Sequence, residues 1–200
     1  MNINFRPATP EDVHAAVPLI YSSGPAAFDF IFSPKPKQAL EFLHYTFVDG
    51  NGEFGYKYHV VGEVEGKVVA VGTAFDGEAT LKYFLAMGMQ IVSFYGLVAF
   101  SVIPRGLQVE SIIQPPKGRL HYIAHLGVHP SMQGKGIGSQ LVEHLMDQGR
   151  NAGKTQTALD VSVINPRAQV LYERLGFKLT GQRESKLPSV PSHNRLERAL

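Results

Sequence analysis

Two spacings of apolar residues run along this chain of 200 residues. Alternation of apolar and polar residues with a period of two predicts β-strands, and these fall at 3–6, 56–64, 68–75, 122–128, 157–163 and 194–200. Apolar residues three and four positions apart predict helices, which fall at 13–22, 37–48, 137–146 and 166–175. The stretch 28–36, rich in Phe and Pro, is expected to be a loop. The chain is therefore predicted to mix helices and strands throughout.

Turn-forming residues mark several of these boundaries. Glu65 and Gly66 separate two alternating segments and predict a hairpin. Asn165 suits a helix N-cap and Pro166 suits the first helical turn. Gly176 stands where a helix C-terminus favours a left-handed residue. One helix is therefore expected from Pro166 to just before Gly176.

The segment 83–103 carries no charged residue over 21 positions. Its length alone would suit a transmembrane helix. It lies, however, between strands that must pair in one sheet, and a single span would put the two halves of the chain on opposite sides of a bilayer. We therefore expect a buried helix here and no association with a membrane.

A glycine-rich turn at 133–138 joins the strand 122–128 to the helix that follows it. Three glycines in five positions allow the backbone to approach a ligand closely and to adopt positive φ. N–H groups at a helix start bind anions, and the helix dipole strengthens that binding. The turn is therefore expected to bind phosphate groups. Its spacing departs from both the Walker A loop and the Rossmann G-x-G-x-x-G fingerprint.

Two motifs in this part of the chain resemble the GNAT N-acetyltransferase superfamily. Gln133, Gly136 and Gly138 match Q-x-x-G-x-G, its acetyl-CoA pyrophosphate loop. Residues 165–177 match N-x-x-A-x-x-L-Y-E-x-x-G-F, its helix beside the pantetheine. The resemblance implies one GNAT domain over residues 1–200, an α/β (α+β) fold with a mixed, mostly antiparallel sheet flanked by helices. Residues 76–118 would be a helical apolar insertion before the CoA-binding strand, forming an acceptor pocket wall, a dimer face or extra core.

The resemblance also assigns roles to residues. Acetyl-CoA, as cosubstrate, would be held by the strand backbone, the turn and the start of the later helix, at Leu126, Gly127, Val128, Gln133, Gly134, Lys135, Gly136, Ile137, Gly138, Ser139 and Asn165. In the family the strand separates from its neighbour here, and the Leu126 N–H would stabilise the thioester oxygen. Tyr172 would act catalytically by protonating the departing thiolate.

The general base is not determined by the motifs. Four titratable residues lie on or near the CoA-binding strand, namely His121, Tyr122, His125 and His129. Histidine titrates in the useful pH range, and a period of two puts the three histidines on one strand face. His125 is favoured as the catalytic base because it precedes Leu126, and Glu63 and Glu110 remain alternatives. Histidines four positions apart on a strand are separated by about 13 Å, too far for one metal ion, so no metal is expected.

Composition narrows the class of protein. The chain has a net charge of +2 and no cysteine. The small charge argues against nucleic acid as a partner, and the lack of cysteine removes a thiolate nucleophile and suits the cytoplasm. We expect a cytoplasmic N-acetyltransferase, by default a homodimer, that moves the acetyl group of acetyl-CoA directly to a primary amine of a small molecule or peptide. An acyltransferase for longer acyl-CoA and a non-catalytic acyl-CoA-binding sensor remain alternatives.

Overall fold

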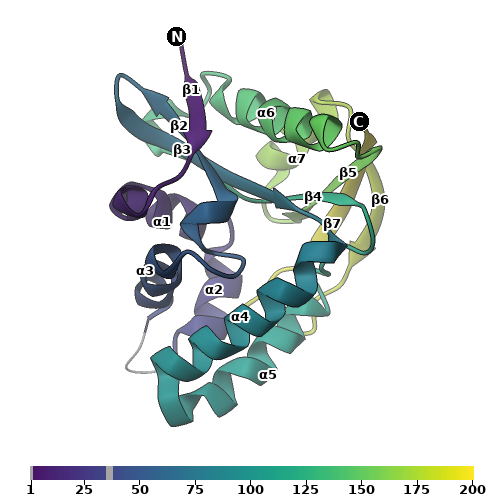
Figure 1. Ribbon diagram of the computed structural model, residues 1–200. Helices are drawn as coiled ribbons and strands as arrows, with labels where there is room; N and C mark the ends of the chain where they lie inside the picture. Colours follow the sequence, from purple (N-terminus) through teal and green to yellow (C-terminus); the bar gives the residue numbers. More distant parts are fainter. Residues whose placement is uncertain (1, 35–37) are drawn as a thin grey trace.

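A seven-stranded sheet forms the centre of the computed structural model, which describes residues 2–34 and 38–200 (Figure 1). The strands run in the order β1-β2-β3-β4-β5-β7-β6, and every neighbouring pair is antiparallel except β4 and β5. Their bounds are Asn4–Pro7 (β1), His59–Val64 (β2), Lys67–Phe75 (β3), His121–Val128 (β4), Gln156–Ser162 (β5), Lys178–Arg183 (β6) and His193–Ala199 (β7). The predicted mixed, mostly antiparallel sheet is confirmed.

Helices cover both faces of this sheet (Figure 1). One face carries α1 (Val13–Ser22), α2 (Pro25–Phe32) and α3 (Ala39–Asp49), which share a core with Val61 and Val71 of the sheet. The other face carries α6 (Ile137–Asn151) and α7 (Pro166–Arg174), which pack with Ile123 and Leu159. The central strands are thus buried on both sides, which accounts for their runs of β-branched residues.

Most predicted elements are confirmed, and two segments differ. The β2–β3 hairpin turns at Glu65 and Gly66 with φ of 53° and 73°, as a two-residue type I′ turn requires. α2 forms where the sequence predicts a loop, because Pro25 suits a first helical turn and the Phe side chains at 28 and 32 are spaced to face the core. β6 is missed because its side chains are mostly exposed and do not alternate. Residue 37, where the second predicted helix begins, lies outside the described residues.

Between β3 and β4 the chain forms a helical hairpin of α4 (Gly77–Tyr95) and α5 (Ala99–Glu110), within the range of the predicted insertion. Its two ends meet at the sheet, where the Gly77 N–H donates to the Gly118 carbonyl at 2.9 Å. The expected buried helix is wrong for most of this segment, since Leu97 is 87% exposed and Phe100 is 81% exposed. Residues 83–103 carry no charge on any side of the hairpin, but only one side meets the core, through residues such as Tyr95.

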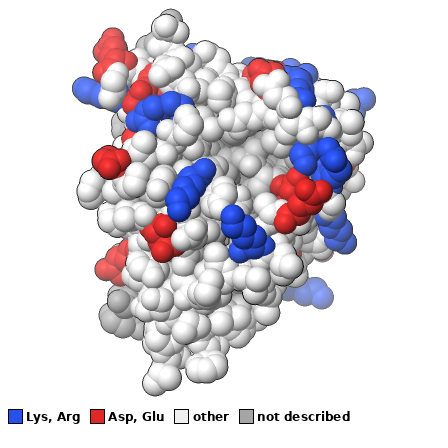
Figure 2. Space-filling model, in the orientation of Figure 1, with Lys and Arg blue, Asp and Glu red and all other residues white. Residues whose placement is uncertain are grey.

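Length and composition alone would allow Gly77–Glu110 to cross a membrane, and only 28% of its most apolar window is buried in the protein. Among the described residues, Pro10–Ser22 and Pro25–Phe32 pass the same test only when taken together across a bend of 103°. The strands that flank the hairpin, β3 and β4, pair with each other, so this segment does not pass once from one side of a bilayer to the other. Figure 2 shows no Lys, Arg, Asp or Glu at the end where α4 turns into α5.

Candidate active site

The strands β4 and β5 lie side by side only at one end. Their parallel pairing joins His121 with Thr157 and Tyr122 with Ala158. Beyond Tyr122 the edge of β4 that faces β5 has no strand partner among the described residues. Unpaired N–H and C=O groups on a strand edge can pair with an extended ligand. This separation is the feature that the family resemblance implies for the binding of pantetheine.

The turn between β4 and α6 exposes a group of N–H donors. Gly134 and Gly136 have φ of 76° and 79°, a left-handed conformation that costs glycine little. Gly136 is the N-cap of α6, and the first helical hydrogen bond runs from the Gln140 N–H to its carbonyl at 3.1 Å. The N–H groups of residues 137–139 therefore have no partner within the helix. This arrangement fits the pyrophosphate of acetyl-CoA.

Two side chains border the turn. The Gln133 amide donates to the Val128 carbonyl at 3.3 Å, which ties the turn to the end of β4. Lys135 Nζ lies 3.5 Å from the Met132 sulfur and forms no ion pair with any described residue. Lys135 is exposed, so its charge is available to an anionic ligand.

Helix α7 positions two of the predicted residues. Asn165 Oδ1 accepts a hydrogen bond from the Ala168 N–H at 3.2 Å, which confirms the predicted N-cap. Gly176 has φ of 83° just after the last turn, again as predicted. Tyr172 is half-buried and packs edge-on against Phe177, with ring centroids 6.2 Å apart. Desolvation raises the pKa of Tyr172 to about 12, so its phenol stays protonated and can donate a proton throughout the physiological range.

A β-bulge in β4 determines where His125 points. Thr73 of β3 pairs with Ala124, but Val71 pairs with Gly127, so two residues of β4 face the single residue between them on β3. His125 lies in this bulge with φ of 55°, one of two non-glycine residues in the described chain with positive φ. Bulges next to active sites redirect a side chain. The His125 ring consequently packs on the α1–α3 side of the sheet, against Phe28 and Phe54.

The bulge overturns the expectation that three histidines share one strand face. His121 lies on the α6 side, where its Nε2 is 2.9 Å from the Leu145 carbonyl. His129 lies past the end of β4 and is exposed, with Nδ1 2.9 Å from Ser131 Oγ. The alternative base Glu63 is held by Arg6 at 2.6 Å. Of the histidines considered, His125 alone faces the side of β4 that carries α1–α3.

His125 belongs to a chain of three polar side chains that the sequence did not suggest. His59 Nδ1 lies 2.9 Å from the Gly55 carbonyl, and His59 Nε2 lies 3.1 Å from His125 Nδ1. On the other side, His125 Nε2 lies 3.3 Å from Glu53 Oε1. Burial, with a smaller contribution from the charge of His125, lowers the pKa of His59 to about 3. His59 is therefore neutral at physiological pH.

These partners fix which nitrogens carry protons. A carbonyl only accepts, so the neutral His59 ring carries its proton on Nδ1 and donates it to Gly55. Its Nε2 must then accept, and His125 Nδ1 is the donor. The second ring nitrogen of His125, Nε2, then faces Glu53 Oε1, which can only accept, so a hydrogen bond between them needs a proton on Nε2. Once protonated, Nε2 can donate to the Glu53 carboxylate.

A cavity of about 490 Å³ opens beside this chain. It lies between α4, the end of α5 and the start of β4, and Glu53, Tyr122 and Glu110 are among its lining residues. The Tyr122 hydroxyl donates to Asp160 at 2.8 Å, and burial raises the pKa of Tyr122 well above its ordinary value. Tyr122 is therefore a fixed, uncharged wall of the cavity rather than a base.

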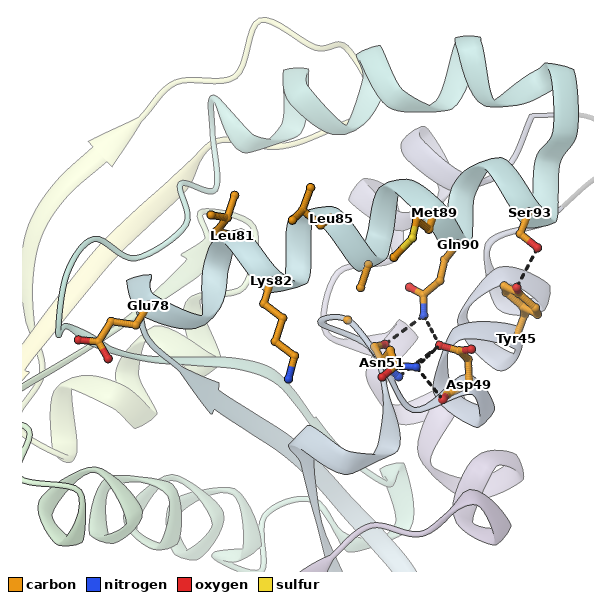
Figure 3. A pocket seen from close by; sticks show the side chains of 12 residues that line it. Tyr45, Asp49, Asn51, Glu78, Leu81, Lys82, Leu85, Met89, Gln90 and Ser93 are labelled. Carbon is orange, nitrogen blue, oxygen red and sulfur yellow. Dashed lines mark hydrogen bonds between the residues drawn. The ribbon is translucent and has the colours of Figure 1, made fainter.

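A larger hollow of about 760 Å³ lies along another side of α4 and is shown in Figure 3. It contains no residue of β4 and shares only Leu81 with the smaller cavity. Its polar side chains tie α4 to the loop that follows α3. The Gln90 amide donates to Asp49 Oδ2 at 2.8 Å and to the Asn51 carbonyl at 3.1 Å. These bonds hold the loop that carries Glu53.

Sequence reasoning missed Glu53 and His59. Both are separated from His125 by more than 60 positions, and neither belongs to a motif. One signal was present, since Gly50, Gly52 and Gly55 cluster around an acid. A Cβ atom on Gly55 would lie 2.4 Å from the Gly50 carbonyl carbon, so this loop folds closely upon itself. A glycine-rich loop of this kind is a usual place for functional groups.

Comparison with known proteins agrees with the fold and the motifs. The family model described as "Acetyltransferase (GNAT) family" matches residues 26–177. An alanine N-acetyltransferase of ribosomal protein bS18 from Salmonella typhimurium is 35% identical over 69 residues, 34% of this chain and 47% of the relative. The L-amino acid N-acyltransferase MnaT of Escherichia coli is 36% identical over 66 residues, 32% of this chain and 38% of the relative.

These curated relatives are matched over less than half of their own length. Among solved structures, an N-acetyltransferase from Staphylococcus aureus Mu50 superposes with a TM-score of 0.71 at 23% identity, over 98% of this chain and all of that one. That likeness supports the fold. Because the family model covers most of the chain, including both sequence motifs, this protein belongs to the GNAT acetyltransferase family.

Proposed function

We propose that this protein is an N-acetyltransferase that moves the acetyl group of acetyl-CoA directly to a primary amine in a ternary complex. Membership of the GNAT family supports acetyl-CoA as the cosubstrate. When bound, acetyl-CoA supplies an acetyl group activated as a thioester. The observation that carries the proposal is the position of His125, whose Nε2 lies 3.3 Å from Glu53, a residue that also lines a cavity large enough for an amine.

Binding falls to the backbone. The N–H groups of the turn and of the first turn of α6 would hold the pyrophosphate. The unpaired edge of β4, from Leu126 to Val128, would align the pantetheine. The Leu126 N–H would serve as a donor to the thioester oxygen, as the family resemblance implies. Asn165 would act from the start of α7, where it also caps the helix.

Two side chains would move protons. An amine is a nucleophile only after it loses a proton, and His125 Nε2 would take that proton from the amine nitrogen. The protonated ring would then be stabilised by donating to Glu53 while Nδ1 still donates to His59. Tyr172, whose phenol stays protonated because desolvation raises its pKa to about 12, would return a proton to the departing sulfur. Direct transfer is favoured because the chain has no cysteine to carry an acyl group.

The test is the His125→Asn variant, assayed for acetyl transfer to a broad panel of primary amines. Asn tolerates positive φ better than most residues, so the bulge should be kept. We expect kcat to fall by about 100-fold, a typical contribution of general-base catalysis, while stabilisation by acetyl-CoA in a thermal-shift titration stays as in the wild type. A variant with unchanged kcat would remove His125 from the mechanism.

Two alternatives differ from this proposal, one in the acyl-CoA that is bound and the other in whether any acyl group is transferred. The apolar α4–α5 hairpin could shape a tunnel for longer acyl chains, and one curated relative is named an N-acyltransferase. A sensor would bind acyl-CoA without turnover. A thermal-shift titration with acetyl-CoA, CoA and long acyl-CoAs separates these readings, since stabilisation grows with ligand concentration and affinity. A larger shift with a long acyl-CoA would favour the acyltransferase, and binding without acetyl transfer to any amine would favour the sensor.

A further inference from the structure

The 490 Å³ cavity that Glu53 shares with the His125 site combines an aromatic wall with two acids. Its volume lies within the range of pockets that enclose small organic molecules. Phe75, Tyr83, Phe84 and Tyr122 supply aromatic surface, and Met87 adds an adaptable apolar side chain. Such a lining favours a ligand with a sizeable apolar body.

The aromatic wall is held in place by its own contacts. Tyr83 packs edge-on against Tyr58 and Phe75, with ring centroids 4.8 Å and 5.4 Å apart. Phe75 in turn packs edge-on against Tyr122 at 5.5 Å. The Tyr122 hydroxyl is fixed by Asp160, which also pairs with Arg195 at 2.7 Å. A wall that is rigid before binding loses little conformational entropy when a ligand packs against it.

The charged residues of the cavity are distributed unevenly. Two acids, Glu53 and Glu110, line the cavity, and Lys117 is the one lysine or arginine among its lining residues. Both carboxyl groups line the same cavity, and desolvation, followed by the negative charge of Glu53, raises the pKa of Glu110. An ammonium group placed near both acids would relieve their repulsion. Glu53 is also the group 3.3 Å from His125 Nε2, so such an ammonium would lie near the proposed base.

From this arrangement we infer that the acceptor is a monocationic primary amine carried on an apolar body about the size of a phenyl ring. This inference rests on the proposed function, because it names the class of amine that the same site would acetylate. The ammonium group lies between Glu53 and Glu110, and the ring packs against Phe75, Tyr83 and Phe84. A polycation fits poorly, because the aromatic wall offers no further acids to pair with its remaining charges.

The experiment compares four probes with the wild-type protein: 2-phenylethylamine, methylamine, spermidine and 2-phenylethanol. We expect kcat/KM for 2-phenylethylamine to exceed that for methylamine by about 100-fold, because the aromatic body adds buried apolar area. Spermidine should be used less well than 2-phenylethylamine. In a binding titration with CoA present, 2-phenylethylamine should bind at least about fivefold more tightly than the neutral 2-phenylethanol, since only the amine can pair with the acids.

A matched pair of variants tests the acidic end. Glu110→Gln should raise the KM for 2-phenylethylamine by about fivefold, the size expected when one partly exposed ion pair is lost, and should reduce its preference over 2-phenylethanol. Glu65→Gln removes the same charge in the exposed β2–β3 turn and should change neither value.

Two kinds of failure are distinguishable. If spermidine or methylamine is used as well as 2-phenylethylamine, or if Glu110→Gln has the KM of the wild type, the substrate class is wrong while acetyl transfer stands. If no probe is acetylated although acetyl-CoA binds, the proposed function fails. The binding titration then still decides the inference, because equal affinity for the amine and the alcohol would refute recognition of a cation.

Discussion

At the scale of single residues, the pairing of His59 with His125 is the most consequential contact. A buried histidine that donates to a carbonyl has one bare nitrogen, and here that nitrogen fixes the proton on His125 Nδ1. His59 is thus a positioning residue that keeps Nε2 of its neighbour ready to accept a proton, as an orienting group does in a catalytic triad. The same burial makes His59 sensitive to acid.

Replacing His59 by Asn should alter both catalysis and the pH dependence of stability. Asn can keep the hydrogen bond to Gly55 but lacks the nitrogen that orients His125, so we expect kcat to fall about tenfold with little change in KM.

For stability, the pKa of His59 is about 3 in the folded protein and near 6.5 when unfolded. The contribution of neutral His59 to the free energy of unfolding is therefore complete above pH 6.5 and is lost as the pH falls toward 3. Between pH 7 and pH 5 the wild type should lose on the order of 1–2 kcal/mol of unfolding free energy because of His59. The His59→Asn variant should not show this part of the loss. Urea titrations at both pH values measure this, and an unchanged difference would contradict it.

The proposed role of Tyr172 as the proton donor to the departing sulfur can be tested by substitution. Tyr172→Phe should lower kcat by about ten- to a hundredfold, because one proton donor is removed, and should leave stabilisation by acetyl-CoA nearly intact. Since the pKa of Tyr172 is raised to about 12, ionisation of the phenol should cause no loss of wild-type kcat below about pH 11. A pH–rate profile of the variant that matches the wild type in both height and shape would show that Tyr172 is not the acid.

At the scale of elements, what the sequence could predict depends on whether the signal is local. The α6 turn and the caps of α7 were predictable because Gly136, Asn165 and Gly176 act on their immediate neighbours. The bulge at His125 was not, because it arises from the register between β3 and β4 and a period of two cannot reveal one extra residue. The sequence could name His125 as a candidate base, but its orientation and its partners Glu53 and His59 depend on that bulge and could not be predicted.

The phosphate-binding role of the α6 turn can be tested with two glycines of similar conformation. Gly136 and Gly153 have φ of 79° and 67°, and a Cβ on Gly153 would meet no atom within 4 Å. Gly136→Glu and Gly153→Glu should therefore each cost about 1 kcal/mol of stability. Only Gly136→Glu puts a negative charge at the proposed pyrophosphate site, so it alone should abolish thermal stabilisation by acetyl-CoA. Equal shifts in both variants would rule out the turn as the binding site.

At the scale of the whole molecule, charge and apolar surface are separated. The charged side chains in view lie away from the end where α4 meets α5 (Figure 2), and Leu97 and Phe100 stand exposed there. Exposed apolar patches of this kind often mark an interface or limit solubility. The burial of this hairpin could not be predicted from the sequence, because an uninterrupted apolar run does not say which of its sides has a partner.

Removing this apolar surface should change association rather than activity. Leu97→Ser combined with Phe100→Ser should raise the solubility limit severalfold and change the free energy of unfolding by less than about 0.5 kcal/mol. If this face joins two copies in the expected homodimer, light scattering should show the variant at the mass of one chain, 22.0 kDa. Leu179→Ser, which removes another exposed apolar residue on β6, should leave solubility and mass unchanged.

The contact between Gly77 and Gly118 bears on how new specificities could arise. The chain leaves the sheet and returns to it at the same place, so a different segment could join the same two ends without moving the strands. Closing such a short gap after deletion costs little loop entropy. The hairpin carries much of the cavity wall, while the turn at Gly136, the bulge and Tyr172 all lie outside it. Exchange of this one segment between related chains could therefore retune the acceptor and leave the transfer machinery untouched.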